Sequence, residues 1–215
     1  WEFLYMYKYY QMSSNKKIIV ETMKMLYNKK FISARDGNIS FKPKNENYFY
    51  ISAGSVKKKD LNEDQIIKVD FDINFENKFN HILKYNKDYK YLPSREIHMH
   101  SFLQTHPYYY NKNTYIVHAH PPNITSYIGI KNSFELNNIK NTFPEINVGN
   151  IGKNVMYHDA GSNNLAMYAF INLLKNDIVG LERHGTLSIG DDIDKIVEDI
   201  ETLEYYIDIE LKAKI

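Results

Sequence analysis

Apolar residues recur along the chain with two periods, one typical of helices and one of strands. Helical spacing follows Ser14, which we interpret as the N-cap of a first helix ending near Lys30. Pro93-Ser94 is expected to open a second helix, with Ser94 as its cap, that ends near Gln104. Three more helices are predicted at residues 123–130, at 163–175 after the N-cap Ser162, and from Asp191 towards the C-terminus.

Short apolar runs bounded by turn residues predict the strands. They are residues 48–52, 66–71, 115–120, 178–181 and 186–189, with 155–158 as a further candidate. Asp36-Gly37-Asn38 is typical of a turn. Helices alternate with strands in the second half and no repeat or interdomain linker is evident, which favours a single α/β domain with a mixed sheet.

The N-terminal residues differ from the rest in composition. Residues 1–13 are dense in aromatic side chains and lack the basic start, long apolar stretch and small-residue cleavage site of a signal peptide. We therefore expect residues 1–13 to be an extension outside the conserved fold, and residues 14–215 to form the domain.

Composition excludes several classes of protein. The 215 residues suffice for one domain with a sizeable core, and the absence of cysteine excludes a disulfide-stapled module, a Cys-based zinc site and a cysteine nucleophile. A net charge of +1 gives little support for binding to nucleic acid or anionic membranes, and no apolar stretch approaches the roughly 20 residues of a membrane span. We expect a cytoplasmic protein that binds neither nucleic acid nor a membrane.

Arginine is rare among the 27 basic residues, and its positions are informative. Arg35 precedes Gly37 by two residues, Arg95 adjoins Glu96, and Arg183 adjoins His184. A genome rich in A and T would favour lysine without selection on the protein, so the three arginines suggest planar, bidentate recognition of an anion. With only three residues, coincidence is the alternative.

His118 and His120 are candidate metal ligands. They stand two apart at the end of an apolar strand, where a period of two places both imidazoles on one face. Spacing alone leaves metal binding and simple packing equally open. By context His184 is the third ligand, since the following Gly185 permits a sharp turn and a close approach to an ion. Three imidazoles with an open fourth position are typical of a catalytic zinc.

Glu96 is the candidate acid or base. Glu96 and His100 are four residues apart and share one helix face, whereas His98 points elsewhere. The structural alternative is that Glu96 only favours the helix N-terminus, where a negative charge is stabilised by about 0.3–1 kcal/mol. Two polar loops, at residues 36–40 and 52–55, could present backbone N–H groups to a phosphate, although such sequences are commonly just turns.

Five short motifs occur in an order that is more specific than any of them alone. GNIS at Gly37, SAGS at Ser52, PSRE at Pro93, HAH at His118 and HG at His184 together resemble the class II aldolase/adducin family, especially its fuculose-phosphate aldolase type, from about Ser14 to Ile215. The resemblance implies a central mixed, largely antiparallel sheet covered by helices on both faces. It also implies a homotetramer with active sites at subunit interfaces.

The resemblance also implies the roles of individual residues. One Zn²⁺ per chain, or another divalent metal, would be held by His118, His120 and His184, with Glu96 as the catalytic acid/base close to the metal. The substrate-binding positions would be Gly37, Asn38, Ala53, Gly54, Ser94 and Arg95, and His100 would have a supporting role.

Three features depart from the family pattern. Aldolase-type members usually carry threonine where Ala53 stands and serine where Arg95 stands. The tyrosine that protonates the aldehyde from a neighbouring subunit has no counterpart between Tyr127 and Tyr157. Tyr205 and Tyr206 are candidate substitutes, with packing of the last helix as their alternative role.

The resemblance to the family, with its three histidines and Glu96 retained, implies a zinc-dependent aldolase that cleaves a ketose phosphate to dihydroxyacetone phosphate and an aldehyde through a metal-stabilised enediolate. Within the superfamily, a pentulose-phosphate 4-epimerase generally has Asp where this chain has Glu96, whereas a methylthioribulose-phosphate dehydratase retains the glutamate and stays open. An adducin-like scaffold without metal or activity is the alternative of another class. That branch typically loses the zinc histidines, so their retention favours an enzyme.

Overall fold

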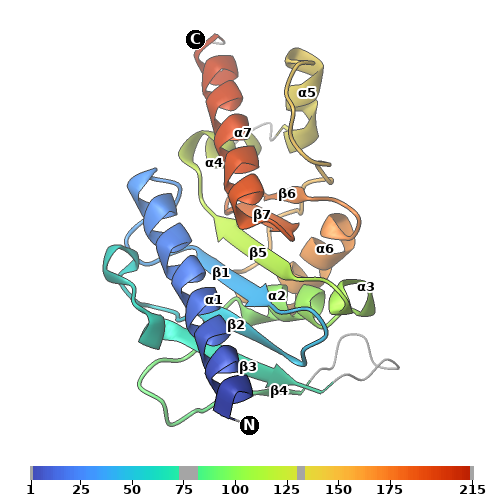
Figure 1. Ribbon diagram of the computed structural model, residues 1–215. Coiled ribbons are helices and arrows are strands. Elements are labelled where there is room, and N and C mark those ends of the chain that lie inside the picture. Colours follow the sequence, from blue (N-terminus) through green and yellow to red (C-terminus); the bar gives the residue numbers. More distant parts are fainter. Residues whose placement is uncertain (1, 73–81, 130–133, 214–215) are drawn as a thin grey trace.

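The core of the protein is one seven-stranded sheet. A computed structural model describes residues 2–72, 82–129 and 134–213, with side chains from Ser14 onwards. The strand order is β4-β3-β2-β1-β5-β7-β6, and every pair of neighbouring strands is antiparallel (Figure 1). The strands are Asn38–Lys42 (β1), Tyr48–Ser52 (β2), Ile66–Phe71 (β3), Leu83–Lys84 (β4), Thr114–Ala119 (β5), Ile178–Leu181 (β6) and Gly185–Gly190 (β7).

Helices cover both faces of this sheet, and each face has its own apolar cluster. On one face lie α1 (Glu2–Asn28), α4 (Pro122–Gly129) and α7 (Ile193–Ala213), and on the other α2 (Ile97–Gln104), α3 (Pro107–Tyr110) and α6 (Asn163–Leu173). A short helix, α5 (Ile139–Thr142), packs beside α7 (Figure 1). Three short 3₁₀ helices complete the described elements: η1 (Lys58–Asp60), η2 (Glu63–Gln65) and η3 (Leu136–Asn138).

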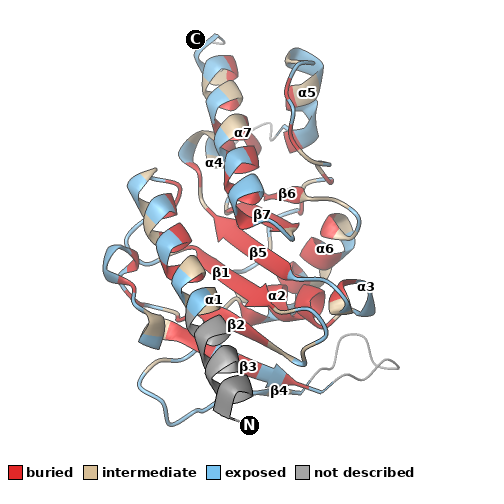
Figure 2. Cartoon of the chain, viewed as in Figure 1, coloured by how far each residue is buried: buried red, intermediate tan, exposed pale blue. Residues whose placement is uncertain are grey.

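The strands at the centre of the sheet are buried on both sides, as Figure 2 shows. In β5, Val117 and Ala119 belong to the cluster beneath α1 and α7, whereas Ile116 belongs to the cluster beneath α2 and α6. Since side chains alternate along a strand, His118 faces the α2 side, where it is fully buried. Among the described helices, none is both long enough and apolar enough to cross a membrane.

The predicted fold class is confirmed, with two refinements. All named strand pairs are antiparallel, and parallel pairing is confined to isolated bridges, Ile151 to Ile178 and Val155 to Leu181. The candidate strand at residues 155–158 is therefore wrong, because only Val155 pairs with the sheet. The assignment of residues 1–13 to an extension stays a prediction.

Two helix starts differ from the prediction. The helix expected to begin at Ser14 runs unbroken from Glu2, because the preceding segment holds no glycine or proline that would stop it. Ser94 does not cap α2, which begins at Ile97 with Glu96 at the N-cap position. The hydroxyl of Ser94 instead accepts hydrogen bonds from the Asn38 amide and the Glu96 backbone N–H.

The remaining elements agree closely with the prediction. The predicted strands are present, and Ser162 caps α6 through a 3.1 Å hydrogen bond from the backbone N–H of Leu165. The short helix expected at residues 123–130 is α4, although residue 130 lies outside the described residues. Two strands were not expected: the short β4, and β1, which begins at Asn38 within the segment interpreted as a polar loop.

A buried carboxylate fixes the start of α4, the helix that follows His120. Glu204, on α7, accepts hydrogen bonds of 2.9 Å from the backbone N–H groups of Asn123 and Ile124. These donors are among the first N–H groups of α4, which have no acceptor within their own helix. The negative charge also complements the positive end of the helix dipole.

We expect Glu204→Ala to lower the free energy of unfolding by about 1–3 kcal/mol, because two buried N–H groups lose their acceptor. The control is Glu198→Ala, an exposed position on the same helix, for which we expect a change within about 0.5 kcal/mol. Urea unfolding of both variants measures the difference. Equal losses would show that the carboxylate does not hold α4.

Candidate active site

Three imidazole rings meet at one end of the sheet. His118 and His120 come from the end of β5, and His184 comes from the turn between β6 and β7. Their ligand nitrogens lie within 4.8 Å of one another, and the Nε2 atoms of His118 and His120 are 2.8 Å apart. In the part of the chain that the structure describes, this is the only group of three or more side chains that could hold a metal ion.

The pairing of β5 with β7 brings His184 to the other two histidines. Ala119 is paired with Thr186, so the turn before β7 ends beside the last residues of β5. Gly185 permits this approach, since a Cβ there would lie 2.2 Å from the carbonyl oxygen of Ala119. The glycine thus allows close contact with the β5 backbone, whereas the sequence suggested a close approach to an ion.

Neighbouring groups fix the orientation of two of the rings. Nδ1 of His118 donates to the carbonyl oxygen of Thr186 at 2.8 Å, which leaves Nε2 as its ligand atom. Nδ1 of His120 lies 3.4 Å from Oδ2 of Asp36, a carboxylate that Ser33 holds through its backbone N–H and its hydroxyl, each at 2.5 Å. Oriented imidazoles of this kind are typical of metal ligands.

Glu96 closes another side of the histidine cluster. Its Oε2 lies 3.1 Å from Nε2 of His118, and its Oε1 lies 3.2 Å from Nε2 of His184. Oε1 is buried and accepts no hydrogen bond of good geometry. Three imidazoles with an unsatisfied carboxylate oxygen beside them fit Zn²⁺ or a similar divalent ion.

The charges of these groups depend on one another. Burial would raise the pKa of Glu96, but the imidazoles of His118 and His184 hold it far below its ordinary value. Burial would lower the pKa of His118, but the Glu96 carboxylate raises it. For His120 burial prevails and the pKa is lowered. Glu96 is therefore an ionised carboxylate inside the protein, stabilised by the imidazoles of His118 and His184.

A chain of buried hydrogen bonds leads from Glu96 into the layer between β1 and α2. The amide nitrogen of Asn38 donates to Glu96 Oε2 at 2.9 Å, and the amide oxygen contacts Nε2 of His100. Nδ1 of His100 lies 2.7 Å from the hydroxyl of Ser40. Nε2 of Gln104 donates to that hydroxyl at 2.9 Å.

The chemistry of the donors sets the direction of this chain. The amide oxygen of Asn38 can only accept, so Nε2 of His100 carries the proton. Burial lowers the pKa of His100 to about 3, so the ring is neutral and its Nδ1 accepts from the Ser40 hydroxyl. In every bond of this chain the donor is the residue farther from Glu96. The last donor, the amide of Asn38, fixes the position of the Glu96 carboxylate.

A cavity of about 350 Å³ opens in front of Glu96. Of the predicted site residues, it is lined by Gly37, Gly54, Ser94, Arg95, Glu96, His120 and His184. Asn38, Ala53, His100 and His118 lie behind this surface and are fully or almost fully buried. The structure thus brings the predicted residues into one region, with some in contact with the cavity and others supporting it.

Several predicted donors already have acceptors. The backbone N–H of Ala53 donates to Gln65 at 2.8 Å, and that of Gly54 donates to Leu92 at 3.1 Å. The Asn38 amide nitrogen donates to both Ser94 and Glu96. An anion in the cavity would therefore depend on other donors, chiefly those of side chains.

Two charged residues of the lining, Asp36 and Lys58, were not predicted as site residues. Asp36 stands in a segment interpreted as a turn and a polar loop, and Lys58 lies in a run of three lysines. Of the three arginines, Arg35 and Arg95 line the cavity, whereas Arg183 lies over the ring of Tyr157 at 5.5 Å. Tyr205 and Tyr206, the candidate proton donors, do not line the cavity of their own chain.

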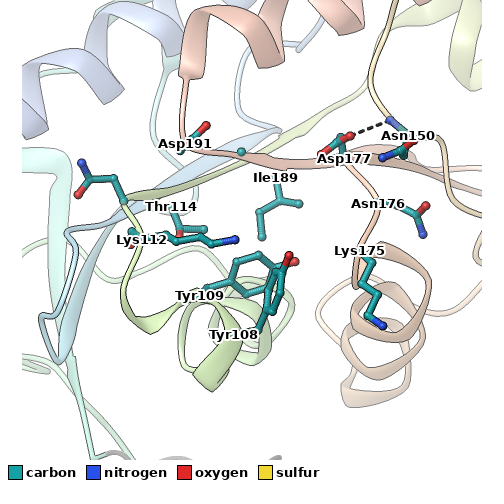
Figure 3. A pocket seen from close by; sticks show the side chains of 12 residues that line it. Tyr108, Tyr109, Lys112, Thr114, Asn150, Lys175, Asn176, Asp177, Ile189 and Asp191 are labelled. Atoms are coloured by element: carbon teal, nitrogen blue, oxygen red, sulfur yellow. Dashed lines mark hydrogen bonds between the residues drawn. The ribbon is translucent and has the colours of Figure 1, made fainter.

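A second cavity, of about 270 Å³, lies at the opposite end of the same strands (Figure 3). It adjoins Thr114, the first residue of β5, and Gly190, the last residue of β7. Tyr108 and Tyr109 project into it, and lysines and aspartates of opposite charge surround it (Figure 3). None of the described side chains there forms a group that could hold a metal, so the chemistry concentrates in the first cavity.

The sequence matches one protein family over most of its length. Residues 17–211 match the class II aldolase and adducin N-terminal domain. No curated protein matches the chain by sequence.

Solved structures share the fold at low sequence identity. The sugar-phosphate aldolase from Thermotoga maritima superposes with a TM-score of 0.71 at 20% identity, over 94% of this chain and 95% of that one. An L-fuculose 1-phosphate aldolase gives 0.68 at 20%, over 94% and 87%. The L-fuculose-1-phosphate aldolase from Thermus thermophilus gives 0.60 at 18%, over 94% of both chains. At these identities the likeness supports the fold.

We expect the purified protein to bind about one divalent ion per chain. His118→Ala and His184→Ala each remove a ligand atom, so we expect their metal affinity to fall at least about 10-fold. His98→Ala, an exposed histidine on α2, is the control and should bind like the wild type. Elemental analysis after gel filtration measures the metal content. Equal metal content in all four proteins would place the ion elsewhere.

His100 should make the metal-free protein sensitive to acid. Its folded pKa of about 3 lies below the ordinary 6.5, so below pH 6.5 the unfolded chain binds a proton that the folded protein excludes. The stability contributed by the neutral ring is complete above pH 6.5 and is lost as the pH falls towards 3. We expect the slope of unfolding free energy against pH in this window to be smaller in His100→Gln by about 1.4 kcal/mol per pH unit. Urea titrations at several pH values test this, and parallel slopes would contradict it.

Proposed function

The chain belongs to the class II aldolase and adducin family, and from that premise we propose that it is a metal-dependent aldolase that cleaves a ketose phosphate to dihydroxyacetone phosphate and an aldehyde. The observation that carries the proposal is the position of Glu96, a buried carboxylate within 3.2 Å of two of three converging imidazoles. A base beside a divalent ion is the arrangement needed to remove a proton from a carbon or hydroxyl next to a carbonyl group.

Each residue has a defined task in this reaction. His118, His120 and His184 would hold the ion, which would supply Lewis-acid polarisation of the substrate oxygens. Glu96 transfers the proton of the carbon next to the carbonyl group through Oε1, the oxygen without a hydrogen bond: it donates this proton after C–C cleavage and removes it in the reverse, aldol direction. Asn38 holds Oε2, so the carboxylate keeps one orientation while Oε1 reacts. The cavity of about 350 Å³ has room for a small phosphorylated sugar.

The retained cluster argues against a scaffold protein. A non-enzymatic member of the family would need neither three oriented imidazoles nor a buried ionised carboxylate. Burying such groups costs stability unless they are paired or bind an ion. Here Asp36, Thr186 and Asn38 each make a contact whose effect is to orient a ligand or the base, which supports catalysis.

A complete site would also require a group at the hydroxyl that becomes the aldehyde, which accepts the hydroxyl proton on cleavage and donates it to the aldehyde in the reverse, aldol direction. In the described residues, the tyrosines near the C-terminus lie outside the cavity, and Tyr205 is 63% exposed on α7. We propose that the donor comes from a neighbouring subunit of a homotetramer, so that an exposed tyrosine of one chain reaches the cavity of the next. Sedimentation that gives a strict monomer at micromolar concentration would contradict this arrangement.

We expect Glu96→Gln to retain the metal and to lower kcat at least about 100-fold, because the amide has the same shape but cannot accept the proton. Glu198→Gln, at an exposed position on α7, should retain full activity. Steady-state assays on metal-loaded protein with a panel of phosphorylated ketoses measure both. Undiminished turnover by metal-loaded Glu96→Gln would remove Glu96 from the mechanism.

The products distinguish the related activities. Release of dihydroxyacetone phosphate with an aldehyde supports the aldolase. Loss of water from the substrate with no C–C cleavage would instead identify a dehydratase, which would use the same base. If the metal-loaded protein turns over no phosphorylated sugar, the scaffold alternative replaces the proposal.

A further inference from the structure

Lys58 is the most deeply buried cation on the wall of the active-site cavity. It is the first residue of η1 and is 1% exposed, whereas its neighbours Lys57 and Lys59 are exposed. Its side chain nevertheless lines the cavity together with Gly54, Ser94 and Glu96. A lysine is almost never fully buried unless its charge has a use or a partner.

The protein satisfies only part of the hydrogen-bonding capacity of this ammonium group. Nζ donates to the carbonyl oxygen of Ala53 at 3.0 Å. In the described part of the chain it has no other hydrogen-bond acceptor and no carboxylate at ion-pair distance. An ammonium group carries three donors, so two N–H groups stay available on the side of the cavity.

Both acidic and basic side chains line the cavity. Glu96, Asp36 and the three histidines lie at the metal-binding end. The side chains of Arg35 and Arg95 line the cavity along with Lys58. The two arginines are exposed, and the guanidinium of Arg35 already donates to the backbone carbonyl of Ser55. Lys58 is therefore the cation that is best shielded from water, where its attraction for an anion is strongest.

We propose that Lys58 is the specificity-determining residue that binds the phosphate group of the substrate. This inference rests on the proposed function for the nature of the substrate, and on the structure for the residue. The backbone N–H groups of Ala53 and Gly54 and the amide of Asn38 donate elsewhere, so these three predicted donors are already engaged. The ammonium of Lys58 replaces them with two donors and a full positive charge.

The chemistry of a buried ammonium suits a phosphate. Burial lowers the pKa of Lys58 to about 8, while Asp36 and Glu96 act in the opposite direction, so the group is charged at neutral pH. Without a ligand, this desolvated charge costs stability. A phosphate dianion would restore the lost solvation with charge-assisted hydrogen bonds. Residues kept for function at the expense of stability are common in active sites.

The test compares Lys58→Met with Lys59→Met, an exposed lysine of the same 3₁₀ helix. Inorganic phosphate is titrated into each purified protein by calorimetry at constant ionic strength. We expect wild type and Lys59→Met to bind phosphate with affinities within twofold, and Lys58→Met to bind at least tenfold more weakly. Both variants keep the metal ligands, so any phosphate bound to the ion contributes equally to all three proteins.

Thermal unfolding distinguishes a role of Lys58 in ligand binding from a role in stabilising the fold. If Lys58 serves the ligand, unliganded Lys58→Met should unfold at the same temperature as wild type or higher, and phosphate should stabilise it less. Lys58→Gln, which can still donate to Ala53, tests the same point if the methionine variant fails to fold. A lower unfolding temperature with unchanged phosphate affinity would make Lys58 a structural residue and overturn the proposal. Absence of phosphate binding to the wild type would also overturn it.

Steady-state kinetics test the same role of Lys58 in an assay that depends on turnover. Lys58→Met should raise KM for a phosphorylated ketose at least tenfold more than for the unphosphorylated analogue. Equal changes for both substrates would overturn phosphate recognition by Lys58 while leaving the aldolase activity intact. If no aldolase activity is found, the phosphate titration still decides the role of Lys58, so the two proposals fail separately.

Discussion

The structure depends on a buried polar layer between β1 and α2, whose side chains are joined by hydrogen bonds. Asn38, Ser40 and Lys42 alternate along one face of β1, and all three are almost completely buried. Opposite them, Glu96, His100 and Gln104 recur at four-residue intervals from the N-cap through α2. Burying such groups is costly unless they are bonded, and the ladder from Gln104 to Glu96 provides the bonds. Lys42 ends the layer by donating to the carbonyls of Pro43, Tyr110 and Lys112.

This layer also fixes the register of the sheet. A slip of β1 by one residue would turn Ile39 and Phe41 towards α2 and the polar side chains towards the apolar cluster under α1. The observed register pairs Asn38 with His118 across β1 and β5, so the amide that bonds to Glu96 and a candidate metal ligand lie side by side. The constraint that keeps the strand in place thus also positions the candidate catalytic groups.

Those parts of the site that depend on local periodicity could be predicted from the sequence. A period of two placed His118 with His120, and a spacing of four placed Glu96 with His100, which both bond to Asn38. β1 was missed for a physical reason: its inward positions are polar, and polar residues after a glycine suggest a loop when their partners on α2 are unknown. Asp36 and Lys58 were missed because burial of a charge is decided by tertiary contacts that a turn or a lysine run does not reveal.

The contacts that determine the fold are distinct from several of the side chains that line the cavity. The two apolar clusters and the β1–α2 layer determine the backbone, which superposes on solved aldolases at 20% identity or less. The metal-binding end is tied to that backbone, because His118 is bonded to β7 and Glu96 to β1. The other wall of the cavity is formed by the short loops around Gly54 and Ser94, which are joined by the bridge between Ala53 and Pro93 and by the hydrogen bond from the Gly54 N–H to the Leu92 carbonyl. Arg95 and Lys58 line this wall, whereas the hydrogen bond that holds the Glu96 carboxylate comes from β1. The cationic groups of the wall and the support of the candidate base therefore belong to different parts of the chain.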